Sequence, residues 1–285
     1  MGTLDENYTY CADEVRKGDP QRFHSALFAR GSERASLMAL YAFNLELIRA
    51  VTITREVMLG AIRLQWWREV MEELFAGHGR EHPVVHALRD TIWHKELPRA
   101  PFDAMIDARM SELDDAGFAT RDEFAHYGQE AEGSLFALAA RTLSPERAGD
   151  FDAGASLAGE AYAGVATLRS VAAQASRKRV LIPQDILREA GTDTSAVLAA
   201  RSGDATRGAV ARVVADAGLA LDRACRAIAT QHVGKALPAF LPLAPIRGEL
   251  RRAEGADDFF VLARRDTPLF VQQWRLLIAA LRGAI

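Results

Sequence analysis

The sequence predicts an all-α fold, and three observations support that prediction. Apolar residues recur at helical spacing from one end of the 285-residue chain to the other. Beyond the short stretch "RVLIP" near residue 180, polar and apolar side chains do not alternate as they do in a strand. No linker and no internal repeat divides the chain. We therefore expect a single helical domain that spans residues 1–285, with a loosely ordered segment over residues 1–19.

The first strongly periodic helix is expected over residues 34–51, in the stretch "RASLMALYAFNLELIRAV". Steps of three and four residues place one set of side chains on a single stripe. That stripe contains Leu37, Leu40, Tyr41, Asn44, Leu47, Ile48 and Val51. Asn44 is the amide on this stripe, and we expect it to bond either to a neighbouring helix or to the polar end of a bound ligand.

The rest of the chain continues the helical pattern. Further helices are expected over residues 55–77, 82–97, 100–117, 120–143, 148–175, 206–233 and 267–284. Gly77 is a stop signal, Pro83 suits a first helical turn, and Thr120 is a good N-terminal cap. The region 148–175 is rich in glycine and alanine, which allows helices to approach closely. A basic loop with Pro183 follows it.

Composition excludes several classes of function. The chain is 49% hydrophobic and 26% charged, with a formal charge of −3, which provides no field for binding nucleic acid. Two cysteines far apart in sequence indicate neither a disulfide framework nor a zinc site. No apolar run approaches the length of a membrane span, and the first residues do not resemble a signal peptide. We expect a cytoplasmic protein, with peripheral contact to the inner membrane left open.

An ordered set of motifs resembles the squalene/phytoene synthase family over roughly residues 20–280. The set includes "ALYAF", "WWREVMEELFAG", "HPVVHAL", "MIDARMSELD", "AEGSLFAL", "GEAYAGVATLRSVAAQASRKRVLIP" and "QHVGKALPAFLPLA". Within the family, "ALYAFNLELIRA" and the basic "RKR" resemble most closely the mitochondrial complex I assembly factors and their bacterial relatives. The resemblance implies an isoprenoid synthase fold, a helical bundle around a central cavity.

The family's synthases join two isoprenoid diphosphates with Mg²⁺ held by two aspartate-rich segments. The resemblance places the acidic positions of the first segment on Ile48, Arg49 and Thr52. It places the two aspartates of the second segment on Ser170 and Gln174. Neighbouring Gln and Asn positions of the family become Ala163 and Ala166. None of these side chains binds Mg²⁺ as a carboxylate does. We therefore expect no catalytic residues, no metal ligands and no cofactor.

The resulting hypothesis is a non-catalytic protein that assists the assembly of respiratory complex I by binding a subunit or assembly intermediate. Two alternatives stay open. The first is a prenyl transferase of the squalene/phytoene synthase type, in which case Mg²⁺ is the cofactor. The second is an isoprenoid- or lipid-binding protein that needs only the apolar cavity. Nine residues are expected to line the cavity or bind a ligand: Tyr41, Asn44, Ile48, Arg49, Ser170, Gln174, Arg177, Lys178 and Arg179.

Other polar groups have simpler interpretations. Arg177, Lys178 and Arg179 form either an anion or lipid-headgroup site or an ordinary solvated loop. His82 and His86 have ligand spacing, but Pro83 places His82 at a helix border and no third ligand lies nearby. The cluster Glu112, Asp114 and Asp115 is expected to be solvated. Trp66, Trp67, Trp93 and Trp274 are expected to pack in the core or at its rim.

Overall fold

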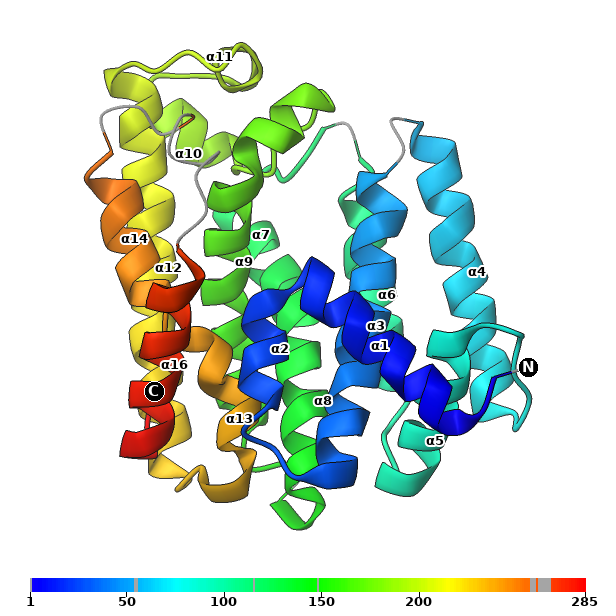
Figure 1. The fold of residues 1–285 in the computed structure, drawn as a ribbon. Helices are drawn as coiled ribbons and strands as arrows, with labels where there is room; N and C mark the ends of the chain where they lie inside the picture. The colour runs from blue at the N-terminus through cyan, green and yellow to red at the C-terminus, as the bar shows by residue number, and fades with distance from the viewer. Residues whose placement is uncertain (1, 54–55, 115, 148, 257–259, 261–267) are drawn as a thin grey trace.

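All regular structure in the described part of the chain is helical. The computed structural model describes residues 2–53, 56–114, 116–147, 149–256, 260 and 268–285, and no strand occurs among them. The longer helices surround a common interior, and both ends of the chain lie on the outside (Figure 1). The helices are α1 (Leu4–Gly18), α2 (Pro20–Ala26), α3 (Gly31–Thr52), α4 (Val57–Phe75), α5 (Pro83–Lys95), α6 (Ala100–Ser111), α7 (Arg121–Gly128), α8 (Ser134–Leu143), α9 (Asp152–Ser176), α10 (Gln184–Glu189), α11 (Thr194–Leu198), α12 (Asp204–Thr230), α13 (Leu237–Phe240), α14 (Ile246–Glu254) and α16 (Leu269–Arg282).

Helix α3 contributes the predicted apolar stripe to the core. Leu37, Leu40 and Leu47 have no exposed surface, and α3 packs against α1, α4, α5 and α8. The ring of Phe43 meets Trp67 of α4 and Phe102 of α6 edge to face, with centroids 5.3 and 5.7 Å apart. The predicted helix and its buried face are therefore confirmed.

Helix α9 packs against α12 on one side and against the α7 region on the other. Its small residues allow this close packing, as the glycine- and alanine-rich sequence predicts. A Cβ on Gly159 would lie 2.3 Å from the backbone nitrogen of Gly133, and one on Gly164 would lie 2.8 Å from the Cβ of Ala217. Both distances are too short for any side chain larger than hydrogen.

The expected helix over residues 120–143 is interrupted by one π-helical turn. Thr120 caps α7 by accepting from the Glu123 backbone N–H at 3.2 Å, and the chain then passes through the π-helix η1 (Gln129–Gly133) into α8. Such turns insert a residue into an α-helix and are frequent at functional sites. Here the turn carries Glu132, which is only 3% exposed.

The N-terminal segment differs from its prediction. Residues 1–19 were expected to be loosely ordered, but α1 begins at Leu4 with a capping box between Thr3 and Glu6. Cys11 and Val15 lie four residues apart on one face, and both are fully buried. This face packs against α3 and α5, where the Tyr8 hydroxyl donates to Asp90 at 2.7 Å. The sparse apolar residues of this segment are thus enough to fix a helix, because they share one face.

Among the described helices, none combines the length and the apolar character that crossing a bilayer requires.

Candidate functional site

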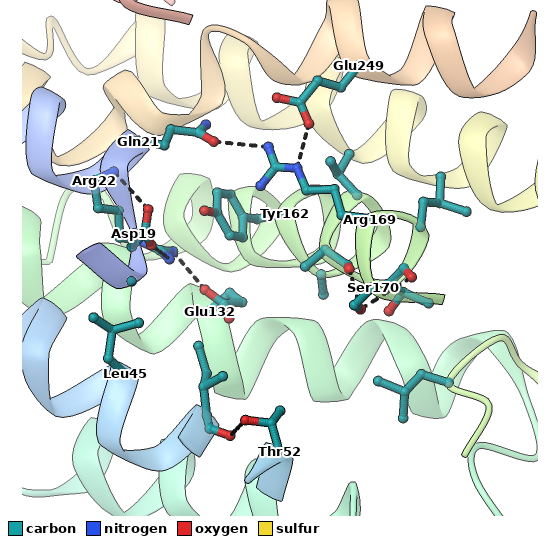
Figure 2. Close-up of a pocket in the computed structure, with 18 of the residues that line it drawn as sticks. Asp19, Gln21, Arg22, Leu45, Thr52, Glu132, Tyr162, Arg169, Ser170 and Glu249 are labelled. Carbon is teal, nitrogen blue, oxygen red and sulfur yellow. Dashed lines mark hydrogen bonds and ion pairs between the residues drawn. The ribbon is translucent and has the colours of Figure 1, made fainter. Parts of the chain in front are cut away.

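A large cavity lies between the first helices and the C-terminal half of the chain. Its volume is about 690 Å³, within the usual size range of small-molecule sites. The turn between α1 and α2, the C-terminal half of α3, the middle of α9 and the helix α14 all contribute to its wall. Figure 2 shows side chains from these segments converging on the cavity. The apolar part of the wall includes Leu45, Val165 and Leu250.

Three of the positions that the resemblance aligns with aspartates lie on the cavity wall. They are Ile48 and Thr52 of α3 and Ser170 of α9, and Ala163 and Ala166 lie beside Ser170. The Thr52 hydroxyl donates to the Ile48 carbonyl at 2.8 Å, and the Ser170 hydroxyl donates to the Ala166 carbonyl at 2.6 Å. Helices α3 and α9 therefore both contribute to the cavity wall, and at these positions they present an apolar side chain and two hydroxyls.

The other predicted residues on α3 lie outside the cavity wall. Tyr41 is buried in the core, and its hydroxyl has no hydrogen-bond partner among the described residues. Asn44 accepts a hydrogen bond of 3.4 Å from Arg109, so a neighbouring helix satisfies it, one of its two predicted fates. Arg49 does not line the cavity, and it forms ion pairs with Glu14 at 2.5 Å and with Glu46 at 2.8 Å.

The predicted residues at the C-terminal end of α9 and in the loop that follows it lie outside the cavity wall. Gln174 donates to the Thr167 carbonyl at 3.3 Å and accepts from the Leu181 backbone N–H at 3.2 Å. Arg179 donates to the Val51 carbonyl at 3.1 Å, which ties the loop to α3. Gln174, Arg177, Lys178 and Arg179 are absent from the cavity wall. Lys178 is exposed, with a positive φ of 60°.

At one end of the cavity lies a buried network of charged groups that sequence reasoning missed. Glu132 accepts from Arg22 at 2.7 Å through one carboxylate oxygen and from Arg109 at 2.5 Å through the other. Arg109 also donates to Glu112 and to the Tyr127 hydroxyl, both at 2.6 Å. The expectation that the acidic cluster is solvated is therefore wrong for Glu112, because this ion pair compensates its burial. Asp114 is exposed as expected, and Asp115 lies outside the described residues.

Burial and charge set the ionisation of this network. Burial would raise the pKa of the Glu132 carboxyl, but the positive charges of Arg22 and Arg109 outweigh it and hold the pKa below its ordinary value. Burial raises the pKa of the Tyr162 hydroxyl to about 12 and that of Tyr127 well above its ordinary value. Both phenols are therefore neutral and Glu132 is ionised at neutral pH.

A second ion pair on the cavity wall lies beside Tyr162. Arg169 of α9 donates to Glu249 of α14 at 2.5 Å and to the Gln21 side chain at 2.9 Å, as Figure 2 shows. The Arg169 side chain lines the cavity and is 38% exposed to solvent. Tyr162 lies between the two ion pairs, and the Arg22 guanidinium lies 4.2 Å from the centre of its ring.

The donor atoms of the cavity do not fit a magnesium cluster. Mg²⁺ requires oxygen ligands, usually with one or two carboxylates. The wall positions that the resemblance aligns with such carboxylates are Ile48, Thr52 and Ser170. Each carboxylate on the cavity wall forms an ion pair with an arginine. These carboxylates belong to Asp19, Glu112, Glu132 and Glu249. Within the described residues, no three His, Cys, Asp or Glu side chains are grouped as metal ligands.

The remaining candidates have structural roles. His82 accepts a hydrogen bond of 3.2 Å from the Val84 backbone N–H and so caps α5, while His86 faces Glu81 at 3.3 Å. Trp67 is buried and packs edge to face against Trp66, with centroids 4.9 Å apart. Trp93 and Trp274 are exposed, so the prediction that all four tryptophans pack in the core or at its rim is wrong for these two.

Similar proteins include both assembly factors and synthases. A bovine (Bos taurus) protein named NADH dehydrogenase (ubiquinone) complex I, assembly factor 6 is 29% identical over 273 residues, which cover 93% of this chain and 81% of that protein. The chloroplastic phytoene synthase 3 of Zea mays is 25% identical over 213 residues, which cover 73% of this chain and 50% of that protein.

The fold and the family follow from two further comparisons. A crystal structure of a dehydrosqualene synthase matches with a TM-score of 0.82 at 15% identity, covering 98% of this chain and 97% of that one. This likeness confirms the predicted isoprenoid synthase fold. A family model described as squalene/phytoene synthase matches residues 15–277. Because the matched residues make up most of this chain, the chain belongs to the squalene/phytoene synthase family.

Proposed function

We propose that this protein assists the assembly of respiratory complex I and that it does so without catalysing prenyl transfer. The observation that carries the proposal is the similarity to a protein named as a complex I assembly factor, at 29% identity over 93% of the chain. The similarity to a phytoene synthase is lower and covers less of both chains.

The cavity chemistry supports the non-catalytic part of the proposal. Ionising an allylic diphosphate requires groups that stabilise the negative charge of the leaving group. Losing one such preorganised group typically costs about 3 to 4 kcal/mol of transition-state stabilisation. Here Ile48, Thr52 and Ser170 occupy positions on both facing helices, and none of them can supply a carboxylate.

The assembly role is tested by deleting the gene in the source organism. We expect the mature complex I band on a native gel and NADH:quinone activity to fall, while succinate dehydrogenase activity serves as the unaffected control. Re-expression of the wild-type chain should restore complex I. Normal complex I content and activity in the deletion strain would count against the proposal.

The transferase alternative is tested on the purified protein. Incubation with farnesyl or geranylgeranyl diphosphate and Mg²⁺ should release no pyrophosphate above the level of a protein-free blank. An active phytoene synthase assayed in parallel shows that the assay works. Pyrophosphate release that disappears in a variant with a filled cavity, such as Ala166→Trp, would establish catalysis and overturn the non-catalytic proposal.

The proposed protein partner is a subunit or assembly intermediate of complex I, and an exposed apolar cluster supports such an interaction. Near the tip between α3 and α4, five large apolar side chains are exposed: Ile53, Val57, Met58, Leu59 and Ile62. Exposed clusters of this kind are typical of interaction sites. The double substitution Met58→Asp with Ile62→Asp should leave the fold intact but fail to restore complex I in the deletion strain. Restoration to the wild-type level would exclude this surface.

We also propose peripheral contact with the membrane through α16. The exposed side chains Phe270, Trp274, Leu277 and Leu281 follow steps of four, three and four residues along this helix. An exposed apolar face with a tryptophan is typical of helices that lie in a lipid interface. Flotation with anionic phospholipid vesicles should weaken for Trp274→Glu. It should not weaken for Leu219→Glu, a matched change on α12. Equal flotation of both variants would contradict the contact.

A further inference from the structure

A second concave surface, the outer groove, lies between α3 and α4. Ile48 and Thr52 of α3 line the central cavity, whereas Arg49 and Ile53 of the same helix line the outer groove. Helix α4, which packs beside α3 in Figure 1, forms the other side. The outer groove has a volume of about 390 Å³ and shares no wall residue with the central cavity. It is therefore a separate candidate site.

Three aromatic rings form part of the wall of the outer groove. The His82 ring meets Trp66 and Trp67 edge to face, with centroids 6.0 and 5.7 Å apart. Trp67 is 3% exposed, so the half-buried rings of Trp66 and His82 provide most of the accessible aromatic surface. Aromatic side chains, tryptophan above all, carry much of the binding energy where proteins hold one another.

Two hydrogen-bond donors on this wall have no acceptor. Arg63 forms no ion pair or hydrogen bond within the described residues, and no acidic residue lies three or four positions from it along α4. His82 accepts the Val84 N–H through Nδ1, so the proton of its neutral ring lies on Nε2, which has no acceptor among these residues. Burial lowers the pKa of His82 and so keeps the ring neutral. A ligand of the outer groove must therefore supply acceptors.

Positive charge is in excess beside these donors. Arg49 pairs with Glu46 at 2.8 Å and with Glu14 at 2.5 Å. Glu14 also pairs with Lys17 at 3.3 Å. These two carboxylates offset two of the three cations, and the charge of Arg63 remains. A carboxylate is the acceptor that matches this charge and fits the planar guanidinium.

The outer groove continues into the exposed apolar cluster at the tip between α3 and α4. Ile53 belongs to both, and Ile62 of the cluster directly precedes Arg63. A ligand that covers both surfaces must be extended and must combine apolar side chains with a carboxylate, as a segment of a protein does.

We propose that the outer groove binds an acidic peptide segment of a protein partner, with a carboxylate on Arg63 and a neighbouring apolar side chain against Trp66. The inference rests on the proposed function, because it assigns this segment to the complex I subunit or intermediate whose assembly the protein assists.

Random peptides displayed on phage and selected on the full chain test the proposal. The enriched sequences should share an aspartate or glutamate next to an aromatic or aliphatic residue. A synthetic peptide of the most enriched sequence should bind the wild-type chain in calorimetry, and its affinity should fall as the salt concentration rises. No enrichment, or enriched peptides without an acidic residue, would overturn the proposal.

Two variants locate the binding site of that peptide. Arg63→Glu should weaken binding by about fivefold or more, because it replaces an attraction by a repulsion at an exposed side chain. Trp66→Ala should weaken it by about 30-fold, and its circular dichroism spectrum serves as the check of folding.

The matched control for the charge reversal is Arg226→Glu on α12, where the arginine is also exposed and has no ion pair within the described residues. It should leave the affinity unchanged. Equal affinities of the wild type and Arg63→Glu would overturn the proposal. Equal weakening by both charge reversals would also overturn it, because total charge would then decide binding.

The outcomes separate this proposal from the proposed function. If the peptide binds as expected but the deletion strain keeps normal complex I, the assembly function fails while the peptide site stands. If no acidic peptide is selected and Arg63→Glu restores complex I fully in the deletion strain, the peptide site is wrong while the assembly role stands. If no acidic peptide is selected and Arg63→Glu reduces flotation with anionic phospholipid vesicles, the surface contacts lipid, and the proposal is wrong.

Discussion

The Arg22 guanidinium donates to the Glu132 carboxylate at 2.7 Å, although 110 residues separate the two in sequence. Both residues are buried, at 2% and 3% exposure. The pair joins α2 to the π-helix η1, and the second oxygen of Glu132 joins the same turn to Arg109 of α6. One carboxylate thus connects three segments at the end of the cavity, and its removal should have large consequences.

Glu132→Gln should destabilise the protein by about 3 to 5 kcal/mol, because it leaves two buried guanidinium groups without their shared counter-charge. Urea denaturation measures the change. Glu72→Gln, on the exposed surface of α4, is the matched control and should stay within about 0.5 kcal/mol of the wild type. A loss of under 1 kcal/mol for Glu132→Gln would mean that water screens the network.

The same carboxylate predicts a dependence of stability on pH. Its pKa in the folded state lies below the ordinary value of 4.5 despite burial, since Arg22 and Arg109 favour the charged form. Stability from this group is therefore fully present above the ordinary pKa and is lost as the pH falls through the folded pKa. Between about pH 6 and about pH 3, the free energy of unfolding should fall more steeply for the wild type than for Glu132→Gln. Parallel curves would contradict this assignment.

The sequence predicted the helices more fully than the site, and Leu37 and Glu132 show why. Leu37 belongs to a periodic stripe, so its burial follows from local spacing. Glu132 and Arg22 belong to residue types that are usually exposed, and no spacing rule pairs groups so far apart in sequence. Glu132 and Arg109 lie within the motifs "AEGSL" and "MIDAR", which offered a signal, whereas Arg22 lies in no such motif. Burial of a charged side chain becomes visible only once the helices are assembled.

Gln174 is a predicted site residue, but its side chain forms hydrogen bonds with the backbone and with Ser170 and does not line the cavity. Its side chain donates to Thr167 and Ser170 and accepts from the Leu181 backbone N–H. Gln174→Ala should cost about 1 to 3 kcal/mol, because it leaves buried polar groups unpaired. Hydrogen exchange at the Leu181 amide should accelerate more than exchange within α12. If only global stability changed and exchange at Leu181 kept pace with α12, the hydrogen bond would not fix this loop.

The close contact between α9 and the π-helix gives the last prediction. A Cβ on Gly159 would lie 2.3 Å from the Gly133 nitrogen and 2.4 Å from the Gly128 carbonyl oxygen, and backbone atoms cannot rotate away as a side chain can. Gly159→Ala should therefore cost about 3 kcal/mol or more, measured by urea denaturation.

The matched control is Gly208→Ala on α12, where the nearest atom to the new Cβ is the Ala190 Cβ at 3.6 Å. There alanine should stabilise the helix by about 0.5 to 1 kcal/mol, because it restricts the unfolded backbone more than glycine does. Opposite signs for the two substitutions would show that steric contact, rather than helix propensity, decides the outcome at Gly159. A Gly159→Ala protein as stable as the wild type would mean that α9 and η1 do not approach this closely, and Glu132 would then lose the framework that holds it against Arg22 and Arg109.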